Sequence, residues 1–265
     1  MGGPLEKKMR ALFFLVALAC SASGCAVPRF EVMPRYGRFS VAGEAAVNAG
    51  ALSSGVDVED AGLEEDEDSI HGRAGFKFGA PHFIVSGISP RFEGTGTLDA
   101  AVDDGTNTIP GGATVNTRLE LGIYDGLVVF DFVPGDTLEL ALGVGGNVLD
   151  FELAFEEVGT GTEVATEETF VVPLLAALGA VQLGPLELQV LGAGFNASYQ
   201  GDSIMYWSGD AFLRLKLLGG DEHVRVSLVG GYRINEFEIE YDDEDATVDV
   251  DLRLQGPYAG LDITL

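Results

Sequence analysis

Cysteine, tryptophan and basic residues are all scarce in this chain of 265 residues. Both cysteines, Cys20 and Cys25, lie within the first 25 positions, so the rest of the chain has neither disulfides nor thiol chemistry. The chain has 15 lysines and arginines against 42 aspartates and glutamates, which gives a net charge of −27. This charge excludes nucleic acid as a partner, because phosphate binding needs a basic face. After position 25 there is no apolar run of about 18 residues, which excludes a helical membrane protein.

Glycine is abundant, with 37 residues, and segments that alternate apolar and polar side chains recur from Gly37 to Leu265. The connections alternate as well. Tight turns lie around 80–82, 133–136, 183–185 and 219–222, and looser acidic loops lie around 51–69, 99–113, 157–167, 199–203 and 242–246. Short turns on one side and long polar loops on the other are the pattern of an up-and-down barrel across an outer membrane.

We therefore predict one all-β domain, an antiparallel up-and-down β-barrel over 37–265 with tight turns at one end and long acidic loops at the other. The alternating segments indicate ten strands. Eight or twelve are the alternatives, because Tyr124-Asp125-Gly126 is also compatible with a hairpin turn. Residues 170–181 are apolar on both faces and contain Pro173, which fits either a strand beside an internal apolar pocket or a partly helical excursion.

The polar face of each predicted strand carries the basic residues of the body, and the loops hold almost none. The opposite faces are apolar, as in Leu138–Val144, Val224–Leu228 and Val248–Leu254, and we expect them to point outward. A lone charge inside a narrow barrel costs several kcal/mol, so inward charges must be paired. A ten-stranded barrel is also too narrow for a general pore. We predict a lumen filled by an ion-pair and hydrogen-bond network of Arg73, Lys77, Arg118, Glu120, Glu139, Arg214, Lys216, Arg225, Arg233, Asp251 and Arg253.

The N-terminus has the features of a secretory leader. Lys7, Lys8 and Arg10 precede the apolar stretch 11–19. The following Ser23-Gly24-Cys25-Ala26 resembles the bacterial lipoprotein box, although Ala22 stands where leucine is usual. The resemblance implies a signal peptide over 1–24, diacylation of Cys25, and a short periplasmic tether over 25–36. The alternative is an ordinary signal peptide cleaved nearby, with Cys25 unmodified.

The C-terminus, from Gly256 to Leu265, resembles the final strand of bacterial outer-membrane β-barrels, with Leu265 in place of the usual terminal phenylalanine. The resemblance to small outer-membrane barrels covers 37–265. It implies a place in the outer membrane of a Gram-negative cell envelope, with the acidic loops extracellular, the N-terminus periplasmic, membrane lipid as the partner, and a monomer.

Few residues suggest chemistry. His71 opens the second predicted strand near the acidic loop, but no motif joins it to a nucleophile, so a structural histidine is the simpler interpretation. Acidic loops offer hard oxygen ligands for a divalent cation, yet without the fixed spacing and glycine of a calcium loop. A weak cation site would use residues such as Asp66, Asp68, Asp103, Asp104 and Asp243.

We therefore expect a non-enzymatic outer-membrane barrel with a structural, surface or envelope role and no cofactor. One alternative is a soluble, lipid-anchored barrel that binds a small apolar ligand, like a lipocalin. Another is an outer-membrane lipid-modifying enzyme or hydrolase that uses His71. Side-chain direction separates the first two, because six residues face lipid in a membrane barrel and the ligand in a lipocalin: Leu138, Leu140, Leu142, Val224, Val226 and Leu228.

Overall fold

The computed structural model describes residues 28–48, 56–58, 60–63, 66–104, 106–135, 137–199, 202–219, 224–242 and 247–265. The predicted leader, Cys25 and Asp243 lie outside this part. No helix in the described ranges is long and apolar enough to cross a membrane.

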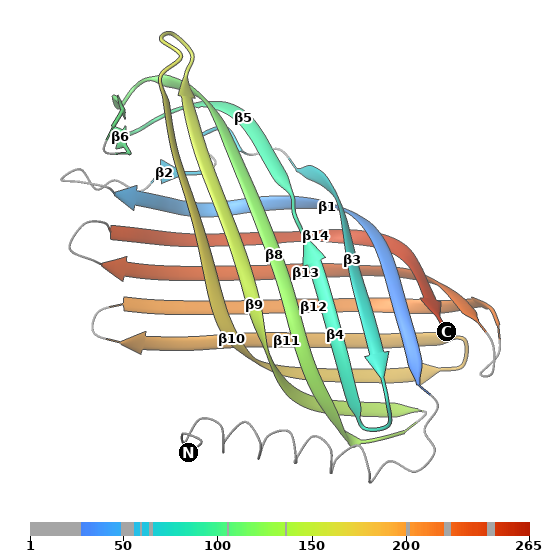
Figure 1. Cartoon of the computed structure of the whole chain (residues 1–265). Coiled ribbons are helices and arrows are strands. Elements are labelled where there is room, and N and C mark those ends of the chain that lie inside the picture. Colours follow the sequence, from blue (N-terminus) through green and yellow to red (C-terminus); the bar gives the residue numbers. More distant parts are fainter. Residues whose placement is uncertain are drawn as a thin grey trace, which may run out of the picture.

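Every regular element in the described ranges is a strand, and the main sheet closes on itself because β14 pairs with β1 (Figure 1). All of these pairings are antiparallel. β4 and β5 together count as one strand of the barrel, since both pair with β8 and only a short break at Ser89-Pro90 separates them. The strands are β1 Arg29–Asn48, β2 Val56–Asp57, β3 Glu67–Lys77, β4 Pro81–Ile88, β5 Arg91–Thr97, β6 Val102–Asp103, β7 Thr108–Ile109, β8 Thr114–Val133, β9 Leu138–Glu157, β10 Glu163–Leu183, β11 Leu186–Tyr199, β12 Asp202–Leu218, β13 Arg225–Asp242 and β14 Thr247–Thr264.

The predicted fold class is confirmed: the described chain forms a closed, antiparallel barrel of ten strands. Tyr124-Asp125-Gly126 is not a turn but lies in the middle of the continuous strand β8. Residues 170–181 are also strand, with Pro173 opposite Gly146 in the pairing of β10 with β9.

The two ends of the barrel differ, as expected. The tight connections β3–β4, β8–β9, β10–β11 and β12–β13 share one end with the start of β1 and the end of β14, where Phe30 and Leu265 exchange backbone hydrogen bonds of 3.2 and 2.8 Å. Two boundaries need correction. β1 begins at Arg29, within the expected tether, and the connection expected to be loose at 157–167 is a tight turn at 158–162.

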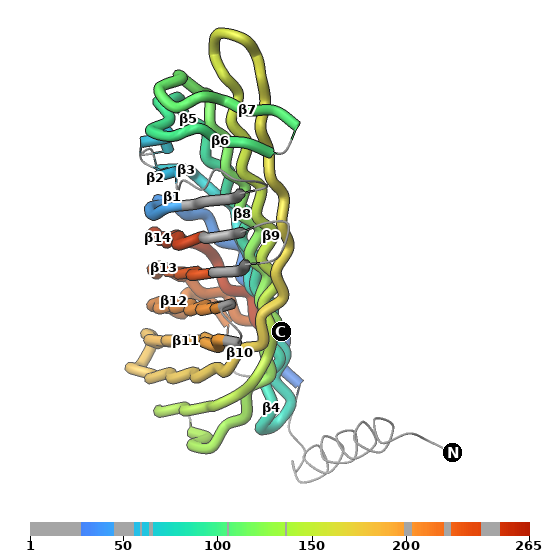
Figure 2. Tube along the Cα trace, turned by 90° about the vertical axis from the view of Figure 1, so that its left-hand side faces the viewer, coloured from blue at the N-terminus to red at the C-terminus, as the bar shows by residue number. Residues whose placement is uncertain are grey.

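The opposite end extends furthest at the β9–β10 hairpin, which rises above its neighbours (Figure 1). The small β6–β7 hairpin lies beside it (Figure 2), where the Asn107 side chain donates to the Glu163 carbonyl at 3.1 Å. Residues 56–58 and 60–63 complete the wall between β1 and β5: Val58 N–H donates to the Gly43 carbonyl, and Thr97 N–H donates to the Asp60 carbonyl.

The barrel consists of two sections with opposite polarity, and β9 shows both. In the lower section, next to the tight turns, alternate residues of 138–148 point outward and are apolar, such as Leu142 and Val144 at 58% and 57% exposure. In the upper section, 149–157, the apolar residues Leu149, Phe151 and Leu153 are buried inside, while outward positions carry acids such as Glu156.

The same reversal occurs on the other long strands. On β14, Leu261 and Ile263 face outward near the tight-turn end, whereas Val250, Leu252 and Leu254 are buried inside the upper section. The expectation that Val248–Leu254 points outward is therefore wrong for these three residues. A barrel wall that is apolar outside below and apolar inside above matches a lower section within lipid and an upper section within water.

The lipocalin alternative is not supported. Leu138, Leu142, Val224 and Leu228 all point away from the lumen, with 43–58% of their surface exposed. A lipocalin would direct these side chains toward an internal ligand.

Candidate functional site

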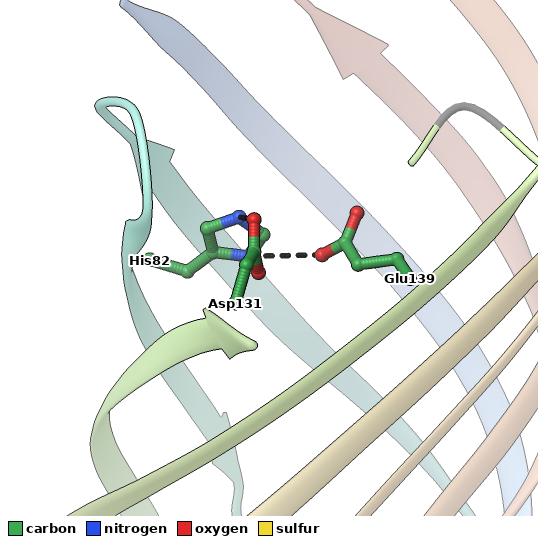
Figure 3. Close-up of side chains that lie close together, drawn as sticks. All are labelled: His82, Asp131 and Glu139. Carbon is green, nitrogen blue, oxygen red and sulfur yellow. Dashed lines mark ion pairs between the residues drawn. The ribbon is translucent and has the colours of Figure 1, made fainter. Parts of the chain in front are cut away.

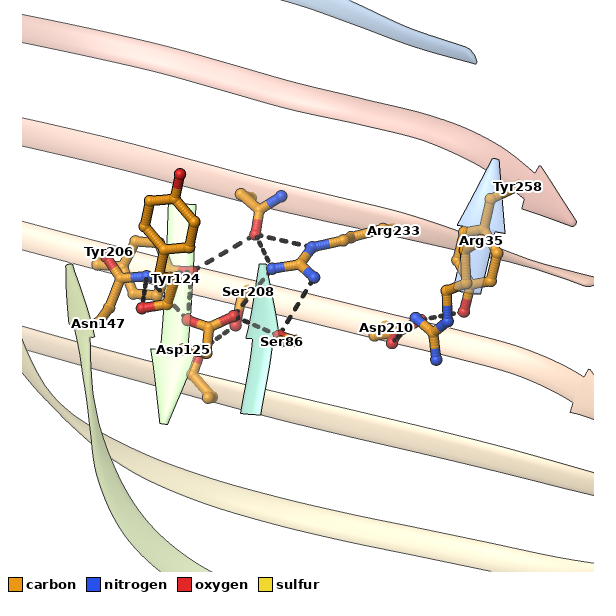
Figure 4. Close-up of polar contacts among 12 residues, drawn as sticks. Arg35, Ser86, Tyr124, Asp125, Asn147, Tyr206, Ser208, Asp210, Arg233 and Tyr258 are labelled. Carbon is orange, nitrogen blue, oxygen red and sulfur yellow. Dashed lines mark hydrogen bonds and ion pairs between the residues drawn. The ribbon is translucent and has the colours of Figure 1, made fainter. Parts of the chain in front are cut away.

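The lumen of the lower section contains a network of charged and polar side chains that crosses from wall to wall. At its upper edge, Arg233 on β13 donates to Asp125 on β8 at 2.8 Å (Figure 4). Asp125 also accepts from Ser86, Asn147 and Tyr206 at 3.1, 2.8 and 3.1 Å. The Asp125 carboxylate thus accepts hydrogen bonds from four donors on four strands, which compensate its buried charge. We call such a contact between opposite walls of the lumen a brace.

A second brace joins β1 to β12. Arg35 donates to Asp210 at 2.7 Å, and the Tyr258 hydroxyl donates to the other carboxylate oxygen (Figure 4). The Arg35 guanidinium also lies 4.6 Å from the centre of the Tyr258 ring, a cation–π distance. Glycine at position 231 leaves room for the Tyr258 hydroxyl, since a Cβ there would lie 2.6 Å from the Tyr258 oxygen.

Arg214 forms a third node nearer the tight turns. It contacts carboxylates from three strands: Glu31 at 2.9 Å, Glu187 at 2.6 Å and Asp262 at 2.7 Å. Arg73 lies beside it, and in the amide orientation that satisfies both groups Arg73 donates to the Gln189 oxygen at 2.7 and 3.1 Å. Three acids around Arg214, with Arg73 nearby, distribute the charge so that no arginine is left alone.

The mouth at the tight-turn end holds the last cluster. Lys77 lies 2.9 Å from Asp131 and 3.1 Å from Glu139, and His82 lies 3.5 Å from each of these carboxylates. A cavity of about 800 Å³ reaches these four residues and extends inward to Arg73 and Arg214. The lower lumen is thus hollow at the mouth and filled by braces above it.

Seven of the predicted network residues lie in this lumen. Arg73, Lys77, Glu139, Arg214 and Arg233 have the partners given above, Arg225 donates to the Thr264 hydroxyl at 3.2 Å, and Lys216 lines the cavity. The structure brings them together in the clusters above rather than in a single continuous chain.

Four predicted network residues lie outside the barrel, and for these the prediction is wrong. Arg118, Glu120 and Arg253 have 43%, 38% and 50% of their side-chain surface exposed on the outer wall of the upper section, and Asp251 is exposed there too. Their partners are on the surface: Arg91 with Glu120, Glu93 with Arg118, and Glu236 with Arg253. Above the membrane section the polar face is the outer face, so these charges meet water.

His71 is not at the rim of the barrel but buried in its interior, at 4% exposure. Its ring makes edge contacts with Phe39 and Tyr258, with centroids 5.4 and 5.0 Å apart. Neither ring nitrogen has a hydrogen-bond partner among the described residues. A catalytic histidine needs a group that orients it and a nucleophile within reach, and this ring has neither bond.

Three of the acids suggested for a loop cation site have local partners. Asp66 pairs with Arg38 at 3.3 Å, Asp103 accepts from the Thr108 hydroxyl, and Asp104 accepts from the N–H groups of Thr106 and Asn107. Within the described ranges, the loop acids are not among the groups close enough to share an ion.

Several network residues escaped the sequence analysis. Arg35 and Glu31 fell within the expected tether, although both alternate with apolar residues from Phe30 onward and this alternation is a strand signal. Asp125 lies in a triplet that is also compatible with a turn, so the sequence does not mark it as an inward charge. Asp210 and Tyr258 stand singly in apolar segments, and no pattern in one strand reveals a partner on the opposite wall.

No protein-family model matches the chain, and no curated protein matches it by sequence. Among solved structures, the fold is similar to that of the outer membrane protease OmpT from Escherichia coli, with 11% identity, 89% of this chain and 97% of that chain covered, and a TM-score of 0.57. The outer membrane protein OprG from Pseudomonas aeruginosa aligns at 10% identity over 91% and 98% of the two chains, but its TM-score of 0.39 carries no argument. At these identities the likeness concerns the fold alone. The chain has the fold of an outer-membrane β-barrel.

Proposed function

We propose that this protein is a non-enzymatic barrel of the bacterial outer membrane with a structural or surface role in the cell envelope. Its lower section would be the membrane anchor, and its upper section would be an acidic body that stands above the membrane. The observation that carries the proposal is the reversal of polarity along the outer wall of single strands, as on β9.

Aromatic side chains support the placement of the lower section in lipid. Tyr36, Tyr124, Trp207 and Tyr232 are 43–56% exposed on the outer wall near its boundary with the upper section. At the tight-turn end, Phe30, Phe83, Phe130 and Phe132 are 40–58% exposed. Two aromatic girdles around an apolar band are typical of outer-membrane barrels, because amphipathic rings favour the lipid headgroups.

The filled lumen favours an anchor over a pore. The Arg233–Asp125 and Arg35–Asp210 braces cross the lower lumen, and the apolar core formed by residues such as Phe39, Leu121 and Phe151 fills the upper section. A solute would have to break buried ion pairs and then enter an apolar core. We therefore infer that the barrel conducts neither ions nor general solutes.

The orientation follows from turn length and charge. Short turns in outer-membrane barrels face the periplasm, so the tight-turn end and the N-terminus would be periplasmic and the acidic upper section extracellular. The lipid of the outer membrane would be the principal partner, and the closed sheet, which leaves no long edge strand, favours a monomer. Divalent cations would screen the exposed acids of the upper section without a dedicated loop site.

The experiment is a set of measurements on the full chain in cells and in lipid. An epitope inserted at Gly159, in the β9–β10 turn, should be labelled by antibody on intact cells. The purified barrel should need detergent for extraction and should migrate differently on gels before and after heating. Release of the protein into plain buffer, or labelling only after the cells are lysed, would contradict the proposal.

Conductance separates the anchor from a channel. The refolded barrel in a planar bilayer should give no stable open state, and the Arg233→Ala and Arg35→Ala double variant should give leakier records than the parent. Steady single-channel currents from the parent protein would overturn the closed-barrel proposal.

An enzyme that uses His71 is the weaker candidate. The protease named among the similar structures shares the fold only, and the buried, unpaired His71 ring argues against acid–base chemistry. Loss of an envelope phenotype in His71→Ala, in a variant that still folds and reaches the surface, would revive it.

Lipidation at Cys25 is a separate proposal that rests on the sequence. Labelled palmitate should be incorporated by the parent chain and not by Cys25→Ser. Equal palmitate incorporation by the two chains, or none in the parent, would contradict lipidation at Cys25.

A further inference from the structure

Three potential metal ligands converge at the tight-turn mouth, away from the braces of the lower lumen. His82 on β4, Asp131 on β8 and Glu139 on β9 come from neighbouring strands, and one donor atom from each lies within 4.8 Å of the others (Figure 3). All three side chains point inward.

The two nitrogens of the His82 ring each approach a different carboxylate, at distances longer than a normal hydrogen bond. His82 Nε2 lies 3.5 Å from Asp131 Oδ2, and His82 Nδ1 lies 3.5 Å from Glu139 Oε1. These distances are at the outer limit for hydrogen bonds. Because an imidazole gives only one nitrogen to a given ion, a shared ion would use one ring nitrogen and one oxygen from each carboxylate, and such a set of three atoms lies within 4.8 Å here.

Unsatisfied buried atoms give independent evidence for a ligand at this position. The Asp131 side chain is only 3% exposed, yet its Oδ1 has no hydrogen-bond partner within the described ranges. His82 Nε2 is also buried and has none there. A buried polar atom without a partner destabilises the fold, and a metal ion would remove that cost by direct coordination.

Lys77 occupies the cation position in the structure. Its ammonium contacts Asp131 at 2.9 Å and Glu139 at 3.1 Å, and it is the most exposed of the four side chains, at 31%. Its flexible stem lets the ammonium leave when a divalent ion arrives, since the cavity of about 800 Å³ begins at this cluster. The same cavity gives the ion a path from the mouth.

We propose that His82, Asp131 and Glu139 bind a divalent transition-metal ion, best suited to Zn²⁺, at the tight-turn mouth, and that Lys77 competes with the ion for the two carboxylates. Zinc accepts imidazole nitrogen and carboxylate oxygen as ligands, and three protein ligands leave a fourth position for water. Magnesium and calcium prefer oxygen-only sites of higher coordination number, so they should bind this site poorly.

The test is a calorimetric titration of the refolded full-length barrel with ZnCl₂ in excess Mg²⁺, which occupies the surface acids. The parent should bind one ion. His82→Ala should weaken binding at least as much as the roughly tenfold to hundredfold loss that follows removal of even an outer-shell partner. Lys77→Met should tighten binding, and a gain of affinity cannot arise from misfolding.

His71→Ala is the matched control, because His71 is also a buried histidine on an inward face but is not part of this cluster. It should leave zinc affinity unchanged. Cobalt in place of zinc should give the visible absorption of a tetrahedral ion in the parent and lose it in His82→Ala. Equal zinc affinity in the parent and His82→Ala, or no tightening in Lys77→Met, would overturn the site.

Discussion

The lower and upper sections of this barrel share their strands but invert their chemistry. On β9, Leu142 is exposed on the outer wall of the lower section, and Phe151 is buried in the core of the upper section. The charged residues change sides with them: Arg233 is 2% exposed inside the lower section, whereas half of the Arg253 side chain is exposed outside the upper one.

The difference teaches that the surroundings, and not the strand, decide which face is polar. Lipid favours an apolar wall, which leaves polar groups only the lumen, where they must find partners. Water accepts charges on the outside, so the apolar side chains of the upper section are free to form an ordinary core. Four experiments would break or sharpen this comparison, and unfolding can be followed by the fluorescence of Trp207, the single tryptophan.

The largest effect is expected from Arg233→Met. It leaves the Asp125 carboxylate buried without its cation, which should cost about 3–5 kcal/mol in the free energy of unfolding in urea. Arg253→Met, on the outer wall, removes a pair with Glu236 at 3.2 Å that is largely exposed, and it should cost at most about 1 kcal/mol. Similar losses for the two variants would refute the assignment of Arg233 to a buried brace.

Leu121→Ala tests the apolar core of the upper section. Leu121 is 0% exposed, and its truncation should leave a cavity and cost about 2–5 kcal/mol in the same assay. Leu142→Ala in the lower section, at 58% exposure, should cost less than about 1 kcal/mol because lipid refills the space. A larger loss at Leu142 than at Leu121 would reverse the comparison.

Leu142→Arg tests the lipid-facing wall directly. A charge near the middle of the apolar band should cost about 2–4 kcal/mol when the barrel is folded into a bilayer. Glu156→Arg, on the outward face of the same strand in the upper section, should stay within about 0.5 kcal/mol of the parent. Equal tolerance of arginine at both positions would place the whole strand in water.

The smallest effect concerns salt. Arg91→Ala removes the pairs with Glu93 and Glu120 on the outer wall, and it should cost at most about 1 kcal/mol at low ionic strength. That cost should fall further in about 1 M salt, where charges are screened within about 3 Å, whereas the cost of Arg233→Met should hardly change. A salt-independent loss for Arg91→Ala would show that this pair is not exposed to solvent.

The sequence was sufficient to predict an antiparallel β-barrel, because the alternation of apolar and polar residues and the alternation of short turns with long loops are local signals. It failed where the apolar residues change from one face of a strand to the other. Near the C-terminus the apolar positions have even numbers from Val250 to Leu254 and odd numbers from Leu261 to Leu265. The prediction that the apolar face points outward along the whole strand therefore placed Asp251 and Arg253 in the lumen, which is wrong. Arg118 and Glu120 were misplaced for the same reason.

The candidate site was predictable only in part. Arg214 and Lys77 could be identified as inward charges from their own strands, because each lies on a polar face. Their partners could not all be paired with them, since Glu31 is 183 positions from Arg214 and only closure of the barrel brings the two together. The cluster of His82, Asp131 and Glu139 does not need closure, but it depends on β4, which is remote in sequence from β9, pairing with β8 in the observed register.

The sequence alone determined an all-β chain, the two unlike ends and the scarcity of basic residues outside strands, and it favoured ten strands over eight or twelve, because these follow from local alternation, turn residues and composition. The tertiary structure alone decided which charges face the lumen and which face water, and which side chains meet across it. That choice depends on the position of each residue along the barrel axis, which a strand pattern does not contain.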